Sequence, residues 1–118
     1  MFGKKNIRWF KVFSSAAKAT EVLPLNKPVK VDMDGGILCL IRTDKGFYAF
    51  EELCPHAKAP LIDSWADENN CLVCPYHRYK FDLDTGFEKT CGGNALKRYP
   101  IEIRDDGLFI GKESKGWF

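Results

Sequence analysis

Two cysteine–histidine pairs are the residues of this sequence best suited to chemistry. The first pair is Cys54 and His56, with one residue between them, and the second is Cys74 and His77, with two. No other histidine occurs in the chain. Thiolate and imidazole are ligands that suit zinc and iron–sulfur centres and suit calcium or magnesium poorly. The pairs therefore predict a metal centre in which two loops each contribute one thiolate and one imidazole.

Three interpretations of these pairs imply different chemistry. The cysteines could be buried apolar side chains, but two mixed pairs that use both histidines of the chain argue against coincidence. A structural zinc module with two Cys and two His ligands is the stronger rival. Zinc fingers usually pair Cys with Cys and His with His along the chain, whereas each segment here supplies one of each. The split pattern favours a cluster of two metal ions, with the zinc module as the alternative.

The ligand pattern resembles that of the Rieske-type [2Fe–2S] ferredoxins, in which two histidines replace two cysteines on one iron. Residues 53–57, 59–61, 71–77, 79–82 and 85–86 also match, and the resemblance covers roughly residues 7–112. It implies one cluster per chain, with one iron held by Cys54 and Cys74 and the other by His56 and His77. It also implies three antiparallel β-sheets, with a small cluster-binding subdomain at about residues 53–82.

The resemblance also indicates a low reduction potential. High-potential members clamp the two ligand loops with a disulfide, and Ala59 and Tyr76 stand at the matching positions. Those members also place hydroxyl groups beside the cluster in a pattern that Tyr79 and Phe81 do not reproduce. Fewer hydrogen bonds to sulfur lower the potential, which we expect near or below the lower end of the roughly −150 to +300 mV Rieske range. Arg78, where the family commonly has Gly, opposes this trend because a cation favours the reduced state.

The resemblance to this family implies that the chain is a one-electron carrier rather than an enzyme. Electrons would pass from a flavin-dependent reductase to a terminal oxygenase, through a docking tip that includes Pro55, Ala57, Pro75 and Arg78. Both histidines are used as cluster ligands and the chain is short, so we expect neither a mononuclear iron site nor the catalytic subunit of an oxygenase. The alternative partner is the large subunit of an NAD(P)H-dependent nitrite reductase, whose Rieske-like small subunits the sequence also resembles. Many of those small subunits lack the ligand residues that this chain has.

Length and charge set wider limits on function. The chain has 118 residues, which predicts a single domain over residues 1–118. Its 18 Lys and Arg against 16 Asp and Glu give a net charge of +2 without a dense basic run, which argues against a nucleic-acid partner. The longest apolar run has five residues. A membrane span needs about 20, so we expect a soluble, monomeric, cytoplasmic protein without a membrane partner. Thiols stay reduced in the cytoplasm, which favours metal ligands over disulfides.

The apolar pattern predicts an antiparallel all-β domain, either a small sandwich or a partial barrel. Alternation at residues 29–33 and 101–104 indicates strands with one face on a core, and the run at residues 37–41 indicates a strand buried on both faces. Further strands are expected at residues 7–13, 47–51, 80–83 and 108–111, with Gly-containing turns at 34–36, 44–46, 84–86 and 105–107. A short helix is expected at residues 15–23, capped by Ser14 or Ser15 and ended by Pro24.

Three cysteines lie outside the ligand pattern. Cys39 falls in the most apolar strand, and we expect it in the core. Cys71 and Cys74 form a Cys-x-x-Cys arrangement that could act as a redox dithiol. Assignment of Cys74 to the metal makes Cys71 a buried thiol instead. Cys91 lies in a Gly-rich segment, residues 91–94, where the family has a third loop over the cluster, and it is the candidate for an exposed, oxidisable thiol.

Overall fold

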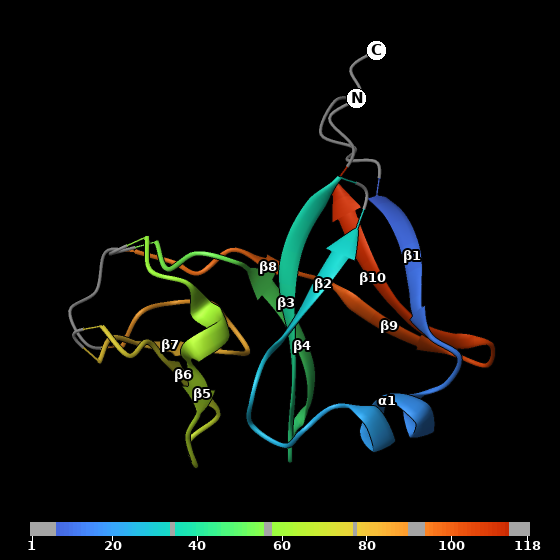
Figure 1. Ribbon diagram of the computed structural model, residues 1–118, viewed down its shortest axis with the longest axis horizontal. Helices are drawn as coiled ribbons and strands as arrows, with labels where there is room; N and C mark the ends of the chain where they lie inside the picture. Colours follow the sequence, from blue (N-terminus) through green and yellow to red (C-terminus); the bar gives the residue numbers. More distant parts are fainter. Residues whose placement is uncertain (1–6, 34, 56–57, 77, 90–93, 114–118) are drawn as a thin grey trace.

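Strands and one short α-helix build the chain in the computed structural model, which describes residues 7–33, 35–55, 58–76, 78–89 and 94–113 (Figure 1). In chain order the elements are β1 (Ile7–Phe13), α1 (Ala16–Val22), β2 (Val29–Met33), β3 (Gly36–Thr43), β4 (Gly46–Glu51), the 3-10 helix η1 (Leu61–Asp63), β5 (Trp65–Ala66), β6 (Cys71–Val73), β7 (Lys80–Asp82), β8 (Arg98–Tyr99), β9 (Ile101–Arg104) and β10 (Gly107–Glu113). All pairings between these strands are antiparallel. The predicted all-β fold class is confirmed.

The strands form three sheets that follow one another across the molecule. The outer sheet has the order β1-β10-β9, the central sheet β2-β3-β4-β8, and the small sheet β5-β6-β7. In Figure 1 the small sheet lies on the left, the central sheet in the middle and the outer sheet on the right. The three-sheet arrangement implied by the family resemblance is therefore the one observed.

The central sheet is buried on both faces, which explains the continuous apolar run in β3. Leu38 and Leu40 pack in one hydrophobic core with residues of α1 and of β10 in the outer sheet. Cys39 and Ile41 pack in a second core with residues of the small sheet, including Phe81. Side chains alternate between the faces of a strand, so the four consecutive apolar residues serve two cores. This second core packs the small sheet against the central sheet.

The helix begins and ends as predicted. The N–H of Lys18 donates a hydrogen bond of 3.0 Å to the side chain of Ser15, which is the N-cap. Leu23 has an extended backbone conformation and precedes Pro24, which cannot continue a helix. Ala19 and Leu23 are buried in the core between the central and outer sheets. The helix therefore covers one end of that core.

Two strand predictions fail in detail. Ile37 and Ile103 are 45% and 56% exposed, although the sequence pattern predicts both to be buried. Ile37 lies beside the turn that connects β2 to β3, and Ile103 lies on β9, an edge strand of the outer sheet. Neither position has a second sheet over it. Strands β5 and β8 were not predicted, because two residues are too few to show an alternating pattern.

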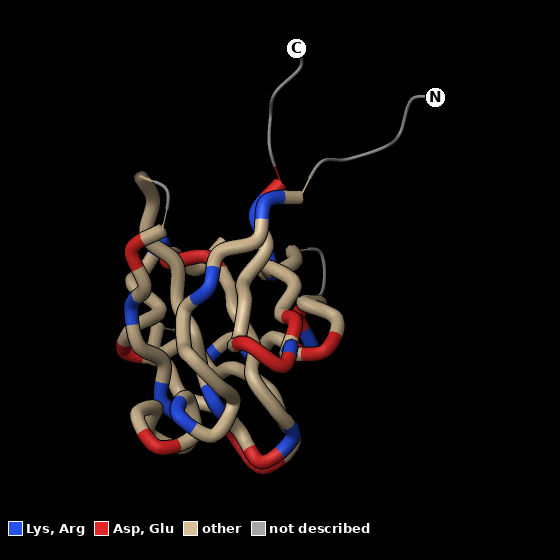
Figure 2. The backbone as a smooth tube through the Cα atoms, turned by 90° about the vertical axis from the view of Figure 1, so that its right-hand side faces the viewer, with Lys and Arg blue, Asp and Glu red and all other residues tan. Residues whose placement is uncertain are grey.

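Charged residues are spread along the chain, with Lys, Arg, Asp and Glu interspersed over the strands and turns that Figure 2 shows. As the sequence suggested, the part of the backbone that the structure describes shows no dense cluster of basic residues in this view. Within the described ranges, no helix has the length and apolarity needed to cross a membrane.

Candidate metal centre

Cys54 begins a tight loop that leaves the central sheet after β4. Its N–H donates a hydrogen bond of 2.8 Å to the carbonyl of Ala59, and its carbonyl accepts one of 2.8 Å from the N–H of Lys58. Lys58 has a left-handed backbone, with φ of 56°. Pro55 follows the cysteine and fixes φ at the start of the loop. These constraints hold Cys54 in the core between the central and small sheets, where it is 0% exposed.

Cys74 begins a second loop with the same closure. The loop leaves β6 of the small sheet, and the N–H of Cys74 donates a hydrogen bond of 2.9 Å to the carbonyl of Tyr79. Arg78 has a φ of 57°, which matches that of Lys58 in the first loop. Glycine adopts this conformation freely, whereas a residue with a Cβ adopts it at a cost of about 1–2 kcal/mol. The departure from the family's usual Gly at position 78 therefore changes the residue but keeps the left-handed turn.

The two loops bring the Cys54 and Cys74 side chains together. Both cysteines are fully buried, and their side chains interact with each other. Burial raises the pKa of Cys74, and the contact with Cys54 acts in the same direction. The backbone N–H of Tyr76 donates to the Cys74 sulfur and acts in the opposite direction, but the pKa remains raised. Two buried thiolates at contact distance would repel each other unless a cation neutralised them.

This donor set fits a thiolate-bound metal centre. A bound metal ion deprotonates thiols outright and supplies the positive charge that the buried pair needs. His56 and His77 lie outside the described residues, as do Ala57 and Cys91, so the imidazole half of the predicted ligand set stays a prediction. In the part of the chain that the structure describes, no three His, Cys, Asp or Glu side chains gather as a metal site. The cysteine pair is thus the described half of the predicted ligand set.

Aromatic and apolar side chains surround the exposed parts of the loops. The guanidinium of Arg78 lies over the Trp65 ring of β5, 5.7 Å from its centroid, and this contact fixes the direction of an exposed cation. Leu53 and Tyr76 are 42% and 52% exposed on the first and second loops. Of the residues predicted to form a docking tip, Pro55 and Pro75 are half-buried and Arg78 is exposed.

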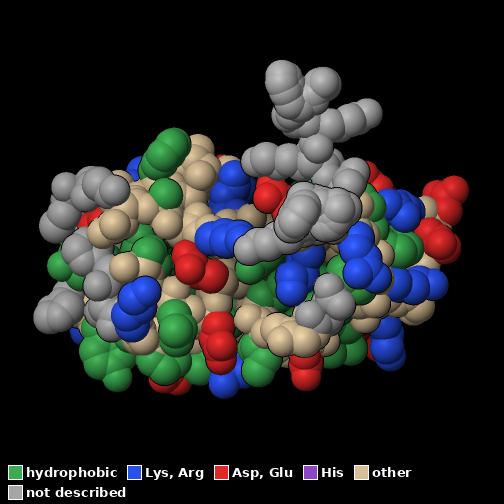
Figure 3. Space-filling view, turned by 90° about the horizontal axis from the view of Figure 1, so that it is seen from above, with side chains coloured by type: hydrophobic (Ala, Val, Ile, Leu, Met, Phe, Trp, Pro, Cys, Tyr) green, Lys and Arg blue, Asp and Glu red, His purple; other side chains and the backbone are tan. Residues whose placement is uncertain are grey.

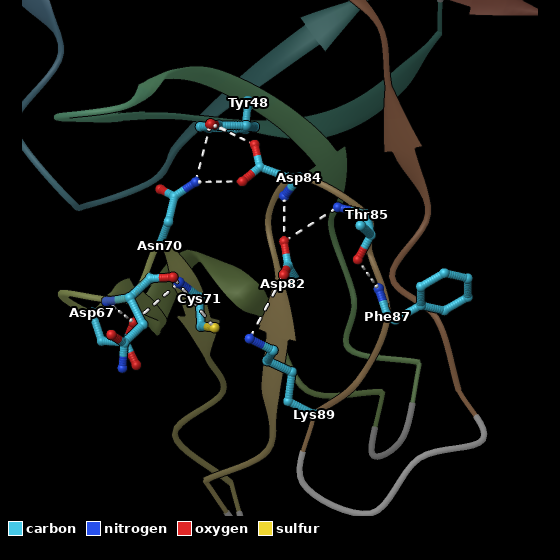
Figure 4. A network of polar contacts seen from close by, with 10 residues as sticks. Tyr48, Asp67, Asn70, Cys71, Asp82, Asp84, Thr85, Phe87 and Lys89 are labelled. Atoms are coloured by element: carbon cyan, nitrogen blue, oxygen red, sulfur yellow. Dashed lines mark hydrogen bonds and ion pairs between the residues drawn. The ribbon is translucent and has the colours of Figure 1, made fainter.

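A polar network joins the small sheet to the central sheet at the other end of β6 from Cys74 (Figure 4), buried at Asn70 and Thr43 and open to solvent at Asp84. Asn70, directly before β6, accepts a hydrogen bond of 2.9 Å from the Thr43 hydroxyl of β3. Its amide nitrogen donates to the Tyr48 hydroxyl at 3.0 Å and to Asp84 at 3.3 Å. The Tyr48 hydroxyl in turn donates to Asp84 at 2.9 Å. The network thus holds the start of β6, the strand that leads to Cys74, against the central sheet.

The remaining described cysteines behave as predicted. Cys39 and Cys71 are 0% and 2% exposed, which confirms that both are buried. Burial raises the pKa of the Cys39 thiol to about 12. Burial also raises the pKa of Cys71, with a further contribution in the same direction from the negative charge of Asp67. Neither thiol has the low pKa of a reactive cysteine, so the redox-dithiol interpretation finds no support.

Sequence reasoning did not identify Asn70 or Trp65 as parts of the site. Asn69 and Asn70 carry a turn signal, and Asn70 has a left-handed φ of 60°, which asparagine tolerates well. The partners of Asn70, however, are 14, 22 and 27 residues away along the chain. No local pattern connects residues at such separations.

Comparison with known proteins supports a single family. The profile of the Rieske [2Fe-2S] domain matches residues 12–100. The ferredoxin subunit of 3-phenylpropionate/cinnamic acid dioxygenase from Photorhabdus laumondii is 30% identical over 92 residues, which are 76% of this chain and 86% of that protein. Pheophorbide a oxygenase of Arabidopsis thaliana is 44% identical over 96 residues, covering 69% of this chain. The match spans only 18% of that oxygenase.

A solved structure shows the same fold at lower identity. A protein assigned as the small subunit of an NADH-dependent nitrite reductase from Mycobacterium tuberculosis superimposes with a TM-score of 0.75. The superposition covers 91% of this chain and 96% of that chain, at 18% identity.

Proposed function

Because the chain belongs to the Rieske [2Fe-2S] domain family and holds one [2Fe–2S] cluster, we propose that it is an electron-transfer component that carries one electron at a time from a flavin-dependent reductase to a terminal oxygenase. The observation that carries this proposal is the buried contact between Cys54 and Cys74 at the start of two matched loops. Relatives support the acceptor, because the dioxygenase ferredoxin subunit is matched over 86% of its length.

The proposed ligand set is Cys54 and Cys74 on one iron and His56 and His77 on the other. The bound cluster supplies a reversible one-electron couple that breaks no bond of a substrate. Residues of the chain bind the cluster and adjust its reduction potential. The N–H of Tyr76 donates to the Cys74 sulfur, and such a bond stabilises the more negative, reduced state. The apolar core around both cysteines excludes water from the thiolate side.

The proposed role in catalysis is delivery of electrons rather than conversion of a substrate. The ligand loops expose Leu53 and Tyr76 at the surface, so a partner can approach the centre closely. We propose that the domain spans residues 1–118, with a cluster-binding subdomain at about residues 53–82. The central sheet positions Cys54 and the small sheet positions Cys74.

The ligand assignment is tested with single variants of the purified protein. We expect Cys74→Ser and His77→Cys to abolish the low-average-g electron paramagnetic resonance signal typical of a reduced Rieske cluster. Cys71→Ala is the matched control, because Cys71 is equally buried and lies only three residues from Cys74. It should keep the signal, the paired iron and the acid-labile sulfide. An unchanged spectrum in His77→Cys would refute the assignment. A colourless protein with stoichiometric zinc, whether purified in air or anaerobically, would establish the zinc module instead.

A second candidate function is that of a nitrite reductase small subunit, favoured by the superposition with a TM-score of 0.75. The identity of 18% supports the shared fold, whereas the relatives at 30% and 44% identity belong to oxygenase systems. The oxygenase acceptor is therefore our first choice. Purification of the tagged chain from its native host separates the two: co-purification with a large sirohaem flavoprotein would reverse the preference.

A further inference from the structure

Each ligand loop presents an exposed cation beside the cysteine pair. Lys58 and Arg78 occupy the left-handed positions of the two loops, at φ of 56° and 57°. Each directly precedes the residue whose carbonyl accepts the cysteine N–H, Ala59 in one loop and Tyr79 in the other. Both cations are exposed. The closure of the loops therefore holds the backbone of both cations at equivalent places beside the site.

These two cations have no carboxylate partner among the described residues. The ion pairs there involve other side chains, and one example is Lys80, which lies 3.3 Å from Asp67. Arg78 contacts the Trp65 ring, which directs its charge without neutralising it. Their charge is thus available to a partner.

The two ligand loops themselves carry no acidic residue. Residues 53–61 and 74–80 contain Lys58, Arg78 and Lys80 and none of the chain's 16 Asp and Glu residues. Of these three cations, Lys80 is paired with Asp67, which directly follows β5 of the small sheet. The described residues of both segments lie on the left of Figure 1, at the end far from the outer sheet.

Apolar side chains accompany the cations on this surface. Leu53 and Tyr76 are exposed on the two loops, and Figure 3 shows hydrophobic side chains gathered at this end, on the left of the view. An apolar centre with charged residues at its rim is the usual composition of a protein–protein interface. Two copies of this surface would bring cation to cation, and a nucleic-acid backbone would leave the apolar side chains without a counterpart.

We propose that the two ligand loops dock a protein partner whose matching surface carries carboxylate groups, with Lys58 and Arg78 as the electrostatic contacts. This inference rests on the proposed electron-transfer function, since it names the chemistry of the surface to which the electron passes. One electron leaves the reduced cluster and reduces the partner's acceptor by one equivalent, or moves in the reverse direction from a reductase. Complementary charge of this kind raises the rate of association and selects the docking orientation.

The test uses gold electrodes coated with a carboxylate-terminated or an ammonium-terminated monolayer. A quartz-crystal microbalance measures bound protein, and voltammetry measures electron exchange with the same films. The loop variant combines Lys58→Asn with Arg78→Asn, because asparagine tolerates a left-handed backbone. The matched control combines Lys11→Gln with Lys45→Gln, two exposed cations of β1 and of the β3–β4 turn, and changes the net charge equally.

We expect the unmodified protein to bind and exchange electrons better on the carboxylate film. The loop variant should bind that film about fivefold to tenfold more weakly at ~10 mM salt, and the difference should fall below about twofold at ~0.5 M salt. The control should stay within about twofold of the unmodified protein.

Equal weakening by the loop variant and the control, or stronger electron exchange on the ammonium film, would overturn the proposal. Retention of the protein on duplex DNA at ~0.1 M salt would overturn the assignment to a protein partner. Failure of the proposed function looks different: a protein without a reducible cluster gives no voltammetric wave. The bound mass on the two films still decides the docking chemistry in that case.

Discussion

Replacement of Asn70 should loosen the small sheet from the central sheet, because its side chain joins the two. The side chain makes three hydrogen bonds, with Thr43, Tyr48 and Asp84, and the residue is 6% exposed. We consider two variants, Asn70→Gly and Asn70→Ala. Both remove the hydrogen bonds, but only alanine adds the strain of a Cβ at the left-handed φ of 60°.

The size of the effect follows from the hydrogen bonds that both variants remove. Each hydrogen bond contributes roughly 0.5–1.5 kcal/mol, and the buried Thr43 hydroxyl loses its acceptor. We therefore expect Asn70→Gly to lower the free energy of unfolding by about 2–3 kcal/mol. Asn70→Ala should lower it by about 1 kcal/mol more, because of backbone strain. Against a typical total of about 5–15 kcal/mol, either loss is large.

Urea denaturation of the cluster-free protein, followed by tryptophan fluorescence, measures these differences. Native-state hydrogen exchange locates them: protection of the β6 amides should fall more than that of β10 in the outer sheet. Thr43→Val is a control that removes one hydrogen bond without changing the backbone at position 70. A loss below about 0.5 kcal/mol for Asn70→Gly would contradict the assigned role of the network, given the cost of unmade buried hydrogen bonds.

Two further predictions concern the pH dependence of stability. Burial raises the pKa of Asp67, but hydrogen bonds from the N–H groups of Cys71 and Asn69 and the contact with Lys80 outweigh it, so the pKa is lowered. Its stabilising contribution is therefore present above the usual pKa of 3.8 and lost as pH falls below that value. Asp67→Asn should lower the free energy of unfolding by about 1–2 kcal/mol at pH 7 in urea denaturation, and the difference from the unmodified protein should shrink as pH falls below 3.8. Burial raises the pKa of Cys39 from 9.0 to about 12, so its thiol ionises first in the unfolded state, and stability falls as pH rises above about 9. In urea titrations, the free energy of unfolding of the unmodified protein should fall by about 2 kcal/mol between pH 8 and pH 10.5, and Cys39→Ala should not show this fall. Parallel losses in both proteins would contradict this.

Much of the fold follows from local patterns in the sequence. Alternation places β2 at the predicted residues, and the bounds of β1 and β9 agree with their predicted ranges. The apolar run in β3 predicts burial on both faces, and the structure confirms this because two cores meet at that strand. Gly86 shows why the turn signals are informative: its φ is 85°, and a Cβ there would approach the Leu96 carbonyl oxygen to 2.6 Å.

Other features depend on contacts that no local pattern reveals. The stacking of Arg78 on Trp65 joins the second loop to a strand of only two residues. The exposure of Ile103 depends on which strands end up at a sheet edge, and alternation alone does not carry that information. For the site, the cysteine pair could be placed from spacing and family resemblance. The polar network around Asn70 could not, because its partners are distant along the chain.

The division of the site between two sheets links stability to cofactor binding. Cys54 follows β4 of the central sheet and Cys74 follows β6 of the small sheet, so a metal bound to both cross-links the same two units that Asn70 joins by hydrogen bonds. The free energy of metal binding contributes to folding when the ligands are not preassembled in the unfolded chain. Loss of Asn70 should therefore cost more in the cluster-free protein, where the network and the second hydrophobic core are the remaining links. Two connections between the same two units are not expected to add independently.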